Sequence, residues 1–336
     1  MSALERYFNR LWYEDHWQQW LFWPASKLAE SVVARRRRQV LQNPPSPLKI
    51  PVIIIGNLTV GGTGKTPLLL FLVDELQKKG LRVGVISRGY GGKASYPLHV
   101  TKDTLPAECG DEPALIVRRT GVPMVVDPQR ARAALALAAA HSVDVILSDD
   151  GLQHYPLSRQ LEVLVVDGQR GFGNQHMLPM GPLREPLDRL DSLRFVVVNG
   201  AASESLQQEL SRHRGLSIYS MQIQPGKIRR LAGSESADSV TFASRQVTAV
   251  AGIGNPDRFF NTLKSMGIVC DKAVFADHYR YSAEDFQPYQ HTTVLMTEKD
   301  AVKVRPQWLA DGWYLSVDAS LTGPLVDDIM RALSLQ

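Results

Sequence analysis

Residues 49–66 read KIPVIIIGNLTVGGTGKT, and this stretch decides the fold class. Its first part is a run of apolar, mostly β-branched residues, which is typical of a parallel strand buried on both faces of a sheet. A glycine-rich loop follows, and residues 67–79 then have a helical composition that ends at Gly80. Because strand, glycine loop and helix follow in this order, we expect backbone N–H groups of the loop to hold phosphate oxygens at the helix N-terminus.

The loop differs at one position from the usual phosphate-loop pattern GxxxxGK[ST]. Thr59 stands where the pattern has its first glycine, although Gly61 and Gly62 keep the loop flexible. Lys65 is expected to reach the β- and γ-phosphates, and the Thr66 hydroxyl to bind Mg²⁺. The residues expected to bind the nucleotide phosphates are Thr59, Val60, Gly61, Gly62, Thr63, Gly64, Lys65 and Thr66.

Two other nucleotide motifs do not fit the sequence. A GTP-binding protein would carry NKxD to read guanine, whereas residues 297–300 (TEKD) have similar residue types with the wrong spacing. Residues 252–254 (GIG) lack the third glycine of a dinucleotide fingerprint, since Asp257 takes its place. Pro256 is better explained as the start of a helix. ATP is therefore the expected nucleotide.

A pair of acids follows a second predicted buried strand, residues 143–147 (VDVIL). Asp149 and Asp150 end this strand, and neighbouring strand residues face opposite ways, so that one acid can face Mg²⁺ while the other takes a second role. Asp149 is the first choice for the metal, with Asp150 as the alternative. A turn with two acids is common at strand ends and is weak evidence by itself. The phosphate loop in the same chain strengthens the interpretation as a metal site.

Regular alternation of strands and helices predicts an α/β fold, a P-loop NTPase-like doubly wound parallel sheet with its ligand at the carboxyl ends of the strands. The pattern weakens over residues 225–241, which we interpret as a basic, Gly/Ser-rich connection, and a second, smaller α/β unit follows. The predicted strands are residues 49–55, 82–87, 123–126, 143–147, 161–166 and 195–199, then 247–252, 269–275, 293–297 and 313–317.

Three domains are expected from these patterns. Residues 1–45 form a helical segment and linker, and residues 46–224 form the P-loop domain. Residues 225–336 form a linker and a smaller α/β domain able to close over the nucleotide, although its last helix, residues 324–333, could pack on the first domain. Closure of two domains is a common way to exclude water from phosphoryl transfer.

The positive charge of the chain is concentrated at its N-terminus. Residues 1–50 hold eight Lys and Arg against four Asp and Glu, which leaves thirty of each sign in the rest of the chain. A nucleic-acid-binding surface would need basic stripes elsewhere, so nucleic acid is not an expected partner. The excess instead favours one local contact with an anionic surface.

Aromatic residues gather in the same segment. Leu4, Phe8, Leu11 and Trp12 share one face of a predicted amphipathic helix. No stretch reaches the ~18 apolar residues that cross a bilayer, so a membrane-surface helix is the preferred interpretation. The alternative is that the rings pack against the body of the protein. The other aromatic residues of the segment are Tyr7, Tyr13, Trp17, Trp20, Phe22 and Trp23, and the arginines are Arg35, Arg36, Arg37 and Arg38.

Two residues are candidates for taking the proton of an acceptor hydroxyl. Asp111 lies in a predicted loop-to-helix junction, and His278 lies in the second unit, so that domain closure could bring them together. Simpler explanations remain for both. Asp111 could be the N-cap of a helix at residues 113–118, and His278 could be a histidine of a surface loop.

Six stretches together resemble one enzyme family, the tetraacyldisaccharide 4'-kinases, which are the lipid A 4'-kinases of Gram-negative bacteria. The resemblance covers almost the whole chain, its motifs occur in the family's order, and Thr59 in the loop fits the family. The stretches are GNLTVGGTGKTP (56–67), ISRGYGG (86–92), GDEP (110–113), DDGLQH (149–154), LPMGPLREP (178–186) and TEKDAVK (297–303).

The resemblance implies transfer of the γ-phosphate of MgATP to the 4'-hydroxyl of a tetraacylated glucosamine disaccharide 1-phosphate in lipid A biosynthesis. It implies a peripheral protein at the cytoplasmic face of the inner membrane, which contacts the bilayer through its N-terminal helix. No obligate protein partner is evident from the sequence. It also implies two domains, joined by a short β linker, whose closure forms the active site.

The resemblance also implies roles for individual residues. Asp111 is the expected base, and His278 forms a dyad with it, while an N-cap role for Asp111 stays compatible with either. Arg184 is an expected phosphate contact. Glu112, Asp149 and Asp150 are expected to support Mg²⁺ and nucleotide binding.

Two other functional classes remain as alternatives. A P-loop ATPase switch of the metallochaperone or partitioning type would hydrolyse ATP with water, and the separate second unit argues against it. A soluble small-molecule kinase would use its N-terminal aromatic residues only in its core, and the Arg-flanked N-terminus argues against that.

Overall fold

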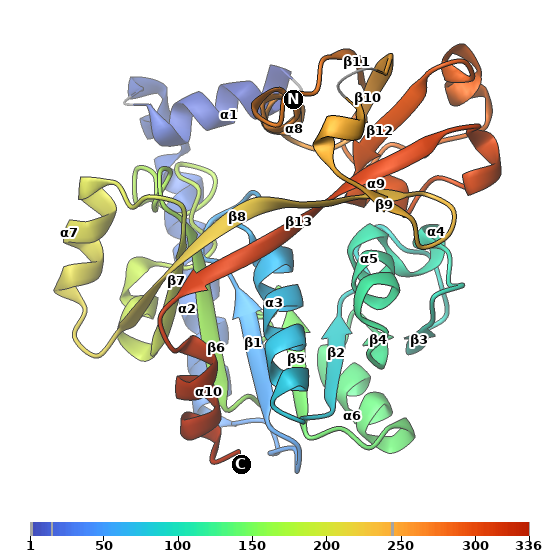
Figure 1. Ribbon diagram of the computed structural model, residues 1–336. Helices are drawn as coiled ribbons and strands as arrows, with labels where there is room; N and C mark the ends of the chain where they lie inside the picture. The colour runs from blue at the N-terminus through green and yellow to red at the C-terminus, as the bar shows by residue number, and fades with distance from the viewer. Residues whose placement is uncertain (1–2, 15, 243–244, 336) are drawn as a thin grey trace.

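The structure is a computed structural model that describes residues 3–14, 16–242 and 245–335, with side chains from Arg6 onward. The side chain of Leu4, part of the predicted N-terminal apolar face, lies outside the described residues. One mixed, mostly parallel sheet of 13 strands runs through the molecule, with helices on both of its faces (Figure 1). Its main path has the order β11-β10-β12-β13-β8-β7-β6-β1-β5-β2-β4-β3.

The first strand group is the parallel sheet predicted around the phosphate loop. β1 lies at its centre between β5 and β6, and all five residues of β1 are buried, as the apolar run predicted. β3 is an antiparallel edge strand that the sequence analysis missed. The strands of this group are β1 (Val52–Gly56), β2 (Val83–Ser87), β3 (Leu98–Val100), β4 (Met124–Val126), β5 (Val145–Asp149), β6 (Leu161–Asp167) and β7 (Phe195–Asn199).

Helices cover both faces of the first strand group, which confirms the doubly wound arrangement. One face packs on α3, α5 and α10, and the other packs on α6, α7 and part of α2. α3 begins two residues before the predicted helix, since proline is tolerated in a first turn and Pro67 does not delay it. The helices are α3 (Lys65–Lys78), α4 (Pro106–Cys109), α5 (Asp111–Thr120), α6 (Arg130–Ala140), η2 (Leu187–Ser192) and α7 (Glu204–Arg212).

A long antiparallel ribbon of β8 (Ser217–Arg230) and β13 (Gly312–Thr322) joins the two halves of the sheet (Figure 1). The interpretation of residues 225–241 as a plain connection was wrong for its first part, because β8 continues to Arg230. Pro225 and Gly226 obscured this strand in the sequence. The structure accommodates the proline where the β8–β13 pairing shifts register, opposite Val317. β9 (Ser236–Ala237) and η3 (Ser239–Phe242) follow.

The second strand group is a smaller parallel sheet that continues from the ribbon, since β13 pairs with both β8 and β12. The two predicted units therefore share one sheet, and their description as separate domains stays a prediction. The elements of this group are β10 (Val247–Ala251), α8 (Pro256–Ser265), β11 (Cys270–Val274), η4 (Glu284–Tyr289), β12 (Thr293–Thr297), α9 (Glu298–Ala301) and η5 (Pro306–Trp308).

The last helix, α10 (Leu325–Leu333), returns to the first strand group. Leu325 and Ile329 are buried in the same core as α3 and α5, and Lys79 of the first group pairs with Asp327 at 2.8 Å. α10 thus completes the hydrophobic core around α3, the helix that follows the phosphate loop.

The N-terminal segment consists of α1 (Ala3–Tyr13), η1 (Trp17–Phe22) and α2 (Trp23–Gln42). The predicted apolar face of the first helix packs on the protein, because Leu11 is buried and Trp12 Nε1 donates to the Pro179 carbonyl at 3.0 Å. In contrast, Trp17 and Trp20 are 69% and 58% exposed. Within the described residues, no helix is long and apolar enough to cross a membrane.

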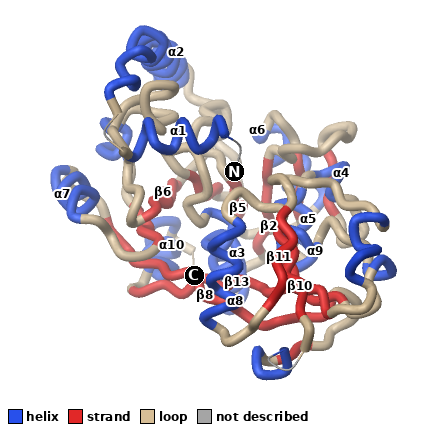
Figure 2. Tube along the Cα trace, turned by 90° about the horizontal axis from the view of Figure 1, so that it is seen from above, coloured by secondary structure: helices blue, strands red, loops and turns tan. Residues whose placement is uncertain are grey.

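Seen from above, α2 and the strands β10 and β11 lie at opposite ends of the molecule (Figure 2). The carboxyl ends of the first-group strands point toward the end of the molecule where α1 lies (Figure 1). The phosphate loop, which follows β1, is therefore at this end of the sheet.

Candidate active site

The phosphate loop turns at Gly64, between β1 and α3. Gly64 has a φ of 100°, in the left-handed region that suits glycine, and it caps α3. A Cβ there would also lie only 2.8 Å from Asn199 Nδ2. Asn199, at the end of β7, donates from Nδ2 to the Thr63 carbonyl at 3.0 Å. The loop is thus held against the carboxyl end of the sheet in the shape that the glycine pattern predicted.

Thr59, the residue in place of the usual glycine, is buried in a short antiparallel bridge with Leu183. Its φ is not positive, so a β-branched residue fits there without strain. The Val60 N–H donates to the Pro182 carbonyl at 2.9 Å. The start of the loop is therefore tied to the LPMGPLREP segment.

Asn57 organises the inside of the loop, and the sequence analysis missed it. Its Nδ2 donates to the Thr59 carbonyl at 2.7 Å and to the Gly61 carbonyl at 3.3 Å. Its Oδ1 accepts from Lys65 Nζ at 3.1 Å. The Lys65 ammonium therefore points across the loop, where the β- and γ-phosphates were expected. Gly61 and Gly62 form the exposed outer part of the loop.

Asp150 is already paired with two cations. Arg184 NH1 lies 3.1 Å from Asp150 Oδ2, and Lys65 Nζ lies 3.7 Å from Oδ1. Although burial acts to raise it, the pKa of Asp150 is lowered below its ordinary value by Lys65 and Arg184. Asp150 is thus a charged partner that positions Lys65 and Arg184, the predicted phosphate contacts.

Asp149 has different surroundings. It is 3% exposed, and its Oδ1 has no hydrogen-bond partner among the described residues. Burial, followed by the charges of Glu112 and Asp150, raises the pKa of Asp149 to about 7. A buried carboxylate oxygen without a donor is what a cation would satisfy.

The residues around the loop fit a Mg²⁺ ion. The described residues include no group of three or more His, Cys, Asp and Glu side chains that could hold a metal ion by themselves. Mg²⁺ does not need such a group, because it is usually bound through one or two carboxylates together with waters and substrate phosphates. The buried Asp149 oxygen and the Thr66 hydroxyl, which donates to Glu112 Oε1 at 3.4 Å, are suitable ligands.

The first two residues of α5 meet two side chains of the second strand group. Asp111 Oδ2 lies 2.9 Å from His278 Nδ1, and Glu112 Oε1 lies 2.5 Å from Lys299 Nζ. The hydrogen bond to Asp111 raises the pKa of His278 although burial opposes it. His278 has a φ of 56° and its side chain is half exposed, as expected for a histidine of a surface loop. Its side chain nevertheless contacts one specific residue, Asp111.

The N-cap explanation of Asp111 was wrong. α5 begins at Asp111 itself, and its N-cap is Gly110, which has a φ of 95°. A Cβ on Gly110 would overlap the carbonyl oxygen of Tyr90. The glycine-rich stretch at residues 87–92 therefore packs directly against the start of α5. Because Gly110 is the N-cap, the carboxylate of Asp111 can contact His278.

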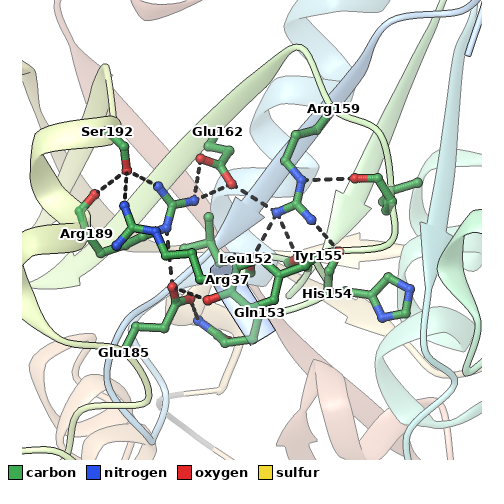
Figure 3. Close-up of polar contacts among 12 residues, drawn as sticks. Arg37, Leu152, Gln153, His154, Tyr155, Arg159, Glu162, Glu185, Arg189 and Ser192 are labelled. Atoms are coloured by element: carbon green, nitrogen blue, oxygen red, sulfur yellow. Dashed lines mark hydrogen bonds and ion pairs between the residues drawn. The ribbon is translucent and has the colours of Figure 1, made fainter. Parts of the chain in front are cut away.

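A polar network joins the DDGLQH and LREP stretches (Figure 3), and it reaches the phosphate loop through Gln153. Gln153 Nε2 donates to the Asn57 carbonyl at 3.2 Å and to Glu185 Oε1 at 2.8 Å. Tyr155 donates to the other oxygen of Glu185 at 2.8 Å. Glu185 is only 1% exposed, and Arg189 Nε balances its charge at 3.3 Å.

The network extends from Arg189 toward the N-terminal segment. Arg189 also pairs with Glu162 of β6 at 2.5 Å, and Arg159 pairs with the same carboxylate at 3.0 Å (Figure 3). Ser192 of η2 accepts from Arg37 of α2 at 3.4 Å. One set of contacts thus runs from α2 to the backbone of the phosphate loop.

His154, the last residue of DDGLQH, lies in a positive environment. Burial, together with the nearby charges of Arg130, Arg159 and Arg88, lowers the pKa of His154 to about 4. Arg130 NH2 donates to the Asp150 carbonyl at 2.6 Å, so this basic cluster adjoins the acid pair. A neutral histidine beside arginines suits an anionic ligand.

The functional side chains that sequence reasoning missed share one property. Asn57, Gln153 and Lys299 lie inside stretches that the sequence analysis singled out, but an amide or a single lysine has no spacing rule that marks it. The partners of Gln153 and Lys299 are also far away in the chain, as for Lys299 and Glu112. Only the fold brings them together.

Comparisons with known proteins agree with one another. The family model for tetraacyldisaccharide-1-P 4'-kinase matches residues 18–334. A tetraacyldisaccharide 4'-kinase of Hahella chejuensis is 44% identical over 334 residues, covering 97% of this chain and 96% of the relative. One of Ectopseudomonas mendocina is 45% identical over 338 residues, covering 99% and 98%.

A solved structure is also similar over most of the chain. It is the "apo" form of LpxK from Aquifex aeolicus in complex with ATP, which superposes with a TM-score of 0.81 at 29% sequence identity. The match covers 94% of this chain and 99% of that one.

Proposed function

The chain belongs to the tetraacyldisaccharide-1-P 4'-kinase family, and on this premise we propose that it transfers the γ-phosphate of ATP to the 4'-hydroxyl of a tetraacyl glucosamine disaccharide 1-phosphate, a step of lipid A biosynthesis. The alternative of an ATPase switch has no support, since kinases match the chain over its full length. ATP is the nucleotide, as in the similar solved structure.

The observation that carries the mechanism is the contact between Asp111 and His278 at 2.9 Å. Glu112, the neighbour of Asp111, contacts the phosphate-loop residue Thr66 at 3.4 Å, so the pair lies beside the nucleotide site. We assign Asp111 as the base that accepts the proton of the 4'-hydroxyl. His278 orients the carboxylate and stabilises its charge until the proton arrives.

The phosphate loop and its cations hold the nucleotide. Backbone N–H groups from Gly61 to Thr66 surround the phosphates, and Lys65 and Arg184 neutralise them from positions fixed by Asp150. Asp149 and Thr66 would hold Mg²⁺, with Glu112 beside them. The ion, when bound, neutralises charge on the β- and γ-phosphates.

Arg88, which is exposed and close enough to His154 to help lower its pKa, supports binding of an anionic group of the acceptor. Arginine is suited to phosphate because its guanidinium donates two parallel hydrogen bonds. The 1-phosphate of the disaccharide is the anionic group that the acceptor provides.

The acceptor is a lipid, so we propose that the N-terminal segment binds the cytoplasmic surface of the inner membrane and that the protein is peripheral there. Trp17, Trp20 and Trp23 are exposed on η1 and at the start of α2, and Arg35 and Arg36 are exposed farther along α2. Indole rings favour the headgroup layer, and basic residues are attracted to anionic lipids.

Purified full-length protein tests this function. We expect label from γ-labelled ATP in a lipid product when tetraacyl disaccharide 1-phosphate is supplied in mixed micelles. A parallel reaction with disaccharide already blocked at the 4'-hydroxyl should give no product. ATP hydrolysis without labelled lipid would overturn the assignment.

A further inference from the structure

Two residues of the second strand group meet consecutive residues of α5. His278 contacts Asp111 at 2.9 Å, and Lys299 contacts Glu112 at 2.5 Å. β11 and β12 are both parallel neighbours of β10, and both residues follow the carboxyl ends of these strands. The same edge of the second strand group therefore faces the nucleotide site at two adjacent points. His278 has a role in the proposed mechanism, and Lys299 has none so far.

The residues on either side of Lys299 are fixed. Asp300 is fully buried and accepts from the Gly252 N–H at 2.9 Å. Glu298 is 8% exposed and pairs with Arg119 of α5 at 2.8 Å. α9 is thereby held on both strand groups, and the Lys299 side chain extends toward the nucleotide site from a rigid base.

The Lys299 ammonium is linked to the phosphate loop through one carboxylate, that of Glu112. Glu112 Oε1, which lies 2.5 Å from Lys299 Nζ, also accepts from the Thr66 hydroxyl at 3.4 Å. Thr66 follows Lys65 in the loop. Lys299 has a flexible four-carbon stem, so rotation of its side chain is enough to move the ammonium from the carboxylate to a phosphate oxygen.

We propose that Lys299 is a further catalytic residue, which hydrogen-bonds the γ-phosphate when ATP is bound and neutralises charge on the phosphoryl group during transfer. The proposal rests on the proposed function. Phosphoryl transfer depends mainly on positioning and charge stabilisation, and a cation from another part of the chain is a common contributor. Lys299 stays protonated throughout, because the acceptor proton goes to Asp111. Glu112 then loses its contact with Lys299 and can turn toward the Mg²⁺ site of Asp149 and Thr66.

A purely structural role for Lys299 makes different predictions. If Lys299 only neutralises Glu112 and holds the second strand group on α5, its removal affects ATP and ADP alike. A contact with the γ-phosphate affects ATP alone, because ADP lacks that group. The ratio of the two affinities therefore separates the explanations without any lipid substrate.

The experiment compares full-length wild type with Lys299→Ala, Lys299→Arg and the control Lys264→Gln, an exposed lysine of α8 in the same strand group. Dissociation constants for ATP and ADP are measured calorimetrically with Mg²⁺ and again with EDTA, and lipid turnover is measured separately. Lys299→Met keeps the aliphatic stem and replaces the alanine variant if that one does not fold.

We expect Lys299→Ala to weaken ATP binding about tenfold and ADP binding less than about twofold in both buffers, and to lower kcat about 100-fold. Lys299→Arg should restore part of both losses, and Lys264→Gln should match wild type. Equal weakening of both nucleotides, or turnover of Lys299→Ala within twofold of wild type, overturns the proposal. Failure of wild type to phosphorylate lipid would instead overturn the proposed function.

Discussion

Asp149 and Asp150 are neighbours in the chain, but the structure gives them different chemistry. Asp150 has a φ of 47° and turns toward Arg184 and Lys65, which keep it charged. Asp149 stays in the buried end of β5 with one oxygen free of hydrogen bonds from described residues. The sequence predicted two roles from strand alternation, and the surroundings of the two side chains favour Asp149 for the metal.

The role of Asp111 is tested by its amide variant. Asp111→Asn keeps the size of the side chain but cannot accept the hydroxyl proton, so kcat should fall by about 100- to 10,000-fold. The ATP dissociation constant should change less than about threefold, because the phosphate loop is untouched. Steady-state turnover and nucleotide titration measure the two effects.

The control is Asp103→Asn, an exposed aspartate near the same helix, which should behave as wild type. Normal turnover of Asp111→Asn would exclude Asp111 as the base.

His154 predicts a specific dependence of stability on pH. Its pKa is lowered to about 4 in the folded protein by burial and by Arg130, Arg159 and Arg88, against about 6.5 when unfolded. Between these values the unfolded chain binds more protons, so stability falls as the pH drops from about 6.5 toward 4. His154→Gln removes this contribution.

Chemical denaturation at pH 7 and pH 5 measures the effect. The loss of unfolding free energy from pH 7 to pH 5 should be smaller in His154→Gln than in wild type by about 1 kcal/mol, a value reduced from the full shift because the ring is partly exposed. Equal losses in the two proteins would show that His154 is not held neutral.

At the scale of the element, the network around Glu185 holds three segments in place relative to one another. They are the loop after β5, the 3₁₀ helix η2 and the phosphate loop after β1. Gln153 and Tyr155 of one loop, and Arg189 of η2, share the buried Glu185 carboxylate (Figure 3). Gln153 also holds the backbone of the phosphate loop at Asn57. Glu185 therefore positions residues that bind the nucleotide without contacting it.

Breaking this network should be costly. Glu185→Ala removes the buried acceptor of Gln153 and Tyr155 and leaves Arg189, which is 6% exposed, with Glu162 as its remaining carboxylate partner, so the unfolding free energy should drop by about 3 kcal/mol. Asp188→Ala, which removes an exposed acid of the same 3₁₀ helix, should cost less than about 0.5 kcal/mol. Urea denaturation of both variants distinguishes them, and similar costs would contradict a structural role for Glu185.

Elements with a strong local signal could be predicted, and elements defined by partners could not. β1, the phosphate loop and α3 were expected from residues 49–79, because a buried apolar run and a glycine loop carry their own pattern. β8 was not predicted as a strand, and its second half is mostly exposed and contains Pro225 and Gly226. Its extension depends on pairing with β13, which lies far away in the chain.

At the scale of the whole molecule, the N-terminal segment has two apolar surfaces with different uses. Leu11 is buried and Trp12 hydrogen-bonds Pro179 in the segment before Arg184, as in the alternative that packed the aromatic residues against the body of the protein. Trp17 and Trp20 stay exposed. A large deletion of the segment would mix the two roles, so single substitutions test membrane binding better.

Trp17→Ser with Trp20→Ser should weaken binding to vesicles that contain anionic lipid by about tenfold or more, because two indole rings no longer enter the headgroup layer. Nucleotide affinity should not change. Vesicle sedimentation measures the binding. Val269→Ser, which removes an 84% exposed side chain of the second strand group, is the control. Unchanged binding of the tryptophan variant would favour a different membrane-facing surface.

The site could be predicted only in part for the same physical reason. Motif spacing indicated the phosphate loop and the acid pair, and the family resemblance joined Asp111 to His278, whose 2.9 Å contact spans 167 positions of the chain. The roles of Lys299 and Gln153 could not be predicted, because their partners come close only in the folded chain. The site residues come together because the two strand groups belong to one sheet. The carboxyl ends of both groups face the nucleotide site.

The central claim is that the γ-phosphate goes to a sugar hydroxyl and not to water. The most direct measurement is the reaction in H₂¹⁸O with tetraacyl disaccharide 1-phosphate, followed by mass spectrometry of the lipid and of inorganic phosphate. We predict a lipid carrying one new phosphate at the 4' position without ¹⁸O, and little labelled inorganic phosphate. Inorganic phosphate carrying ¹⁸O, with the lipid unchanged, would contradict the account.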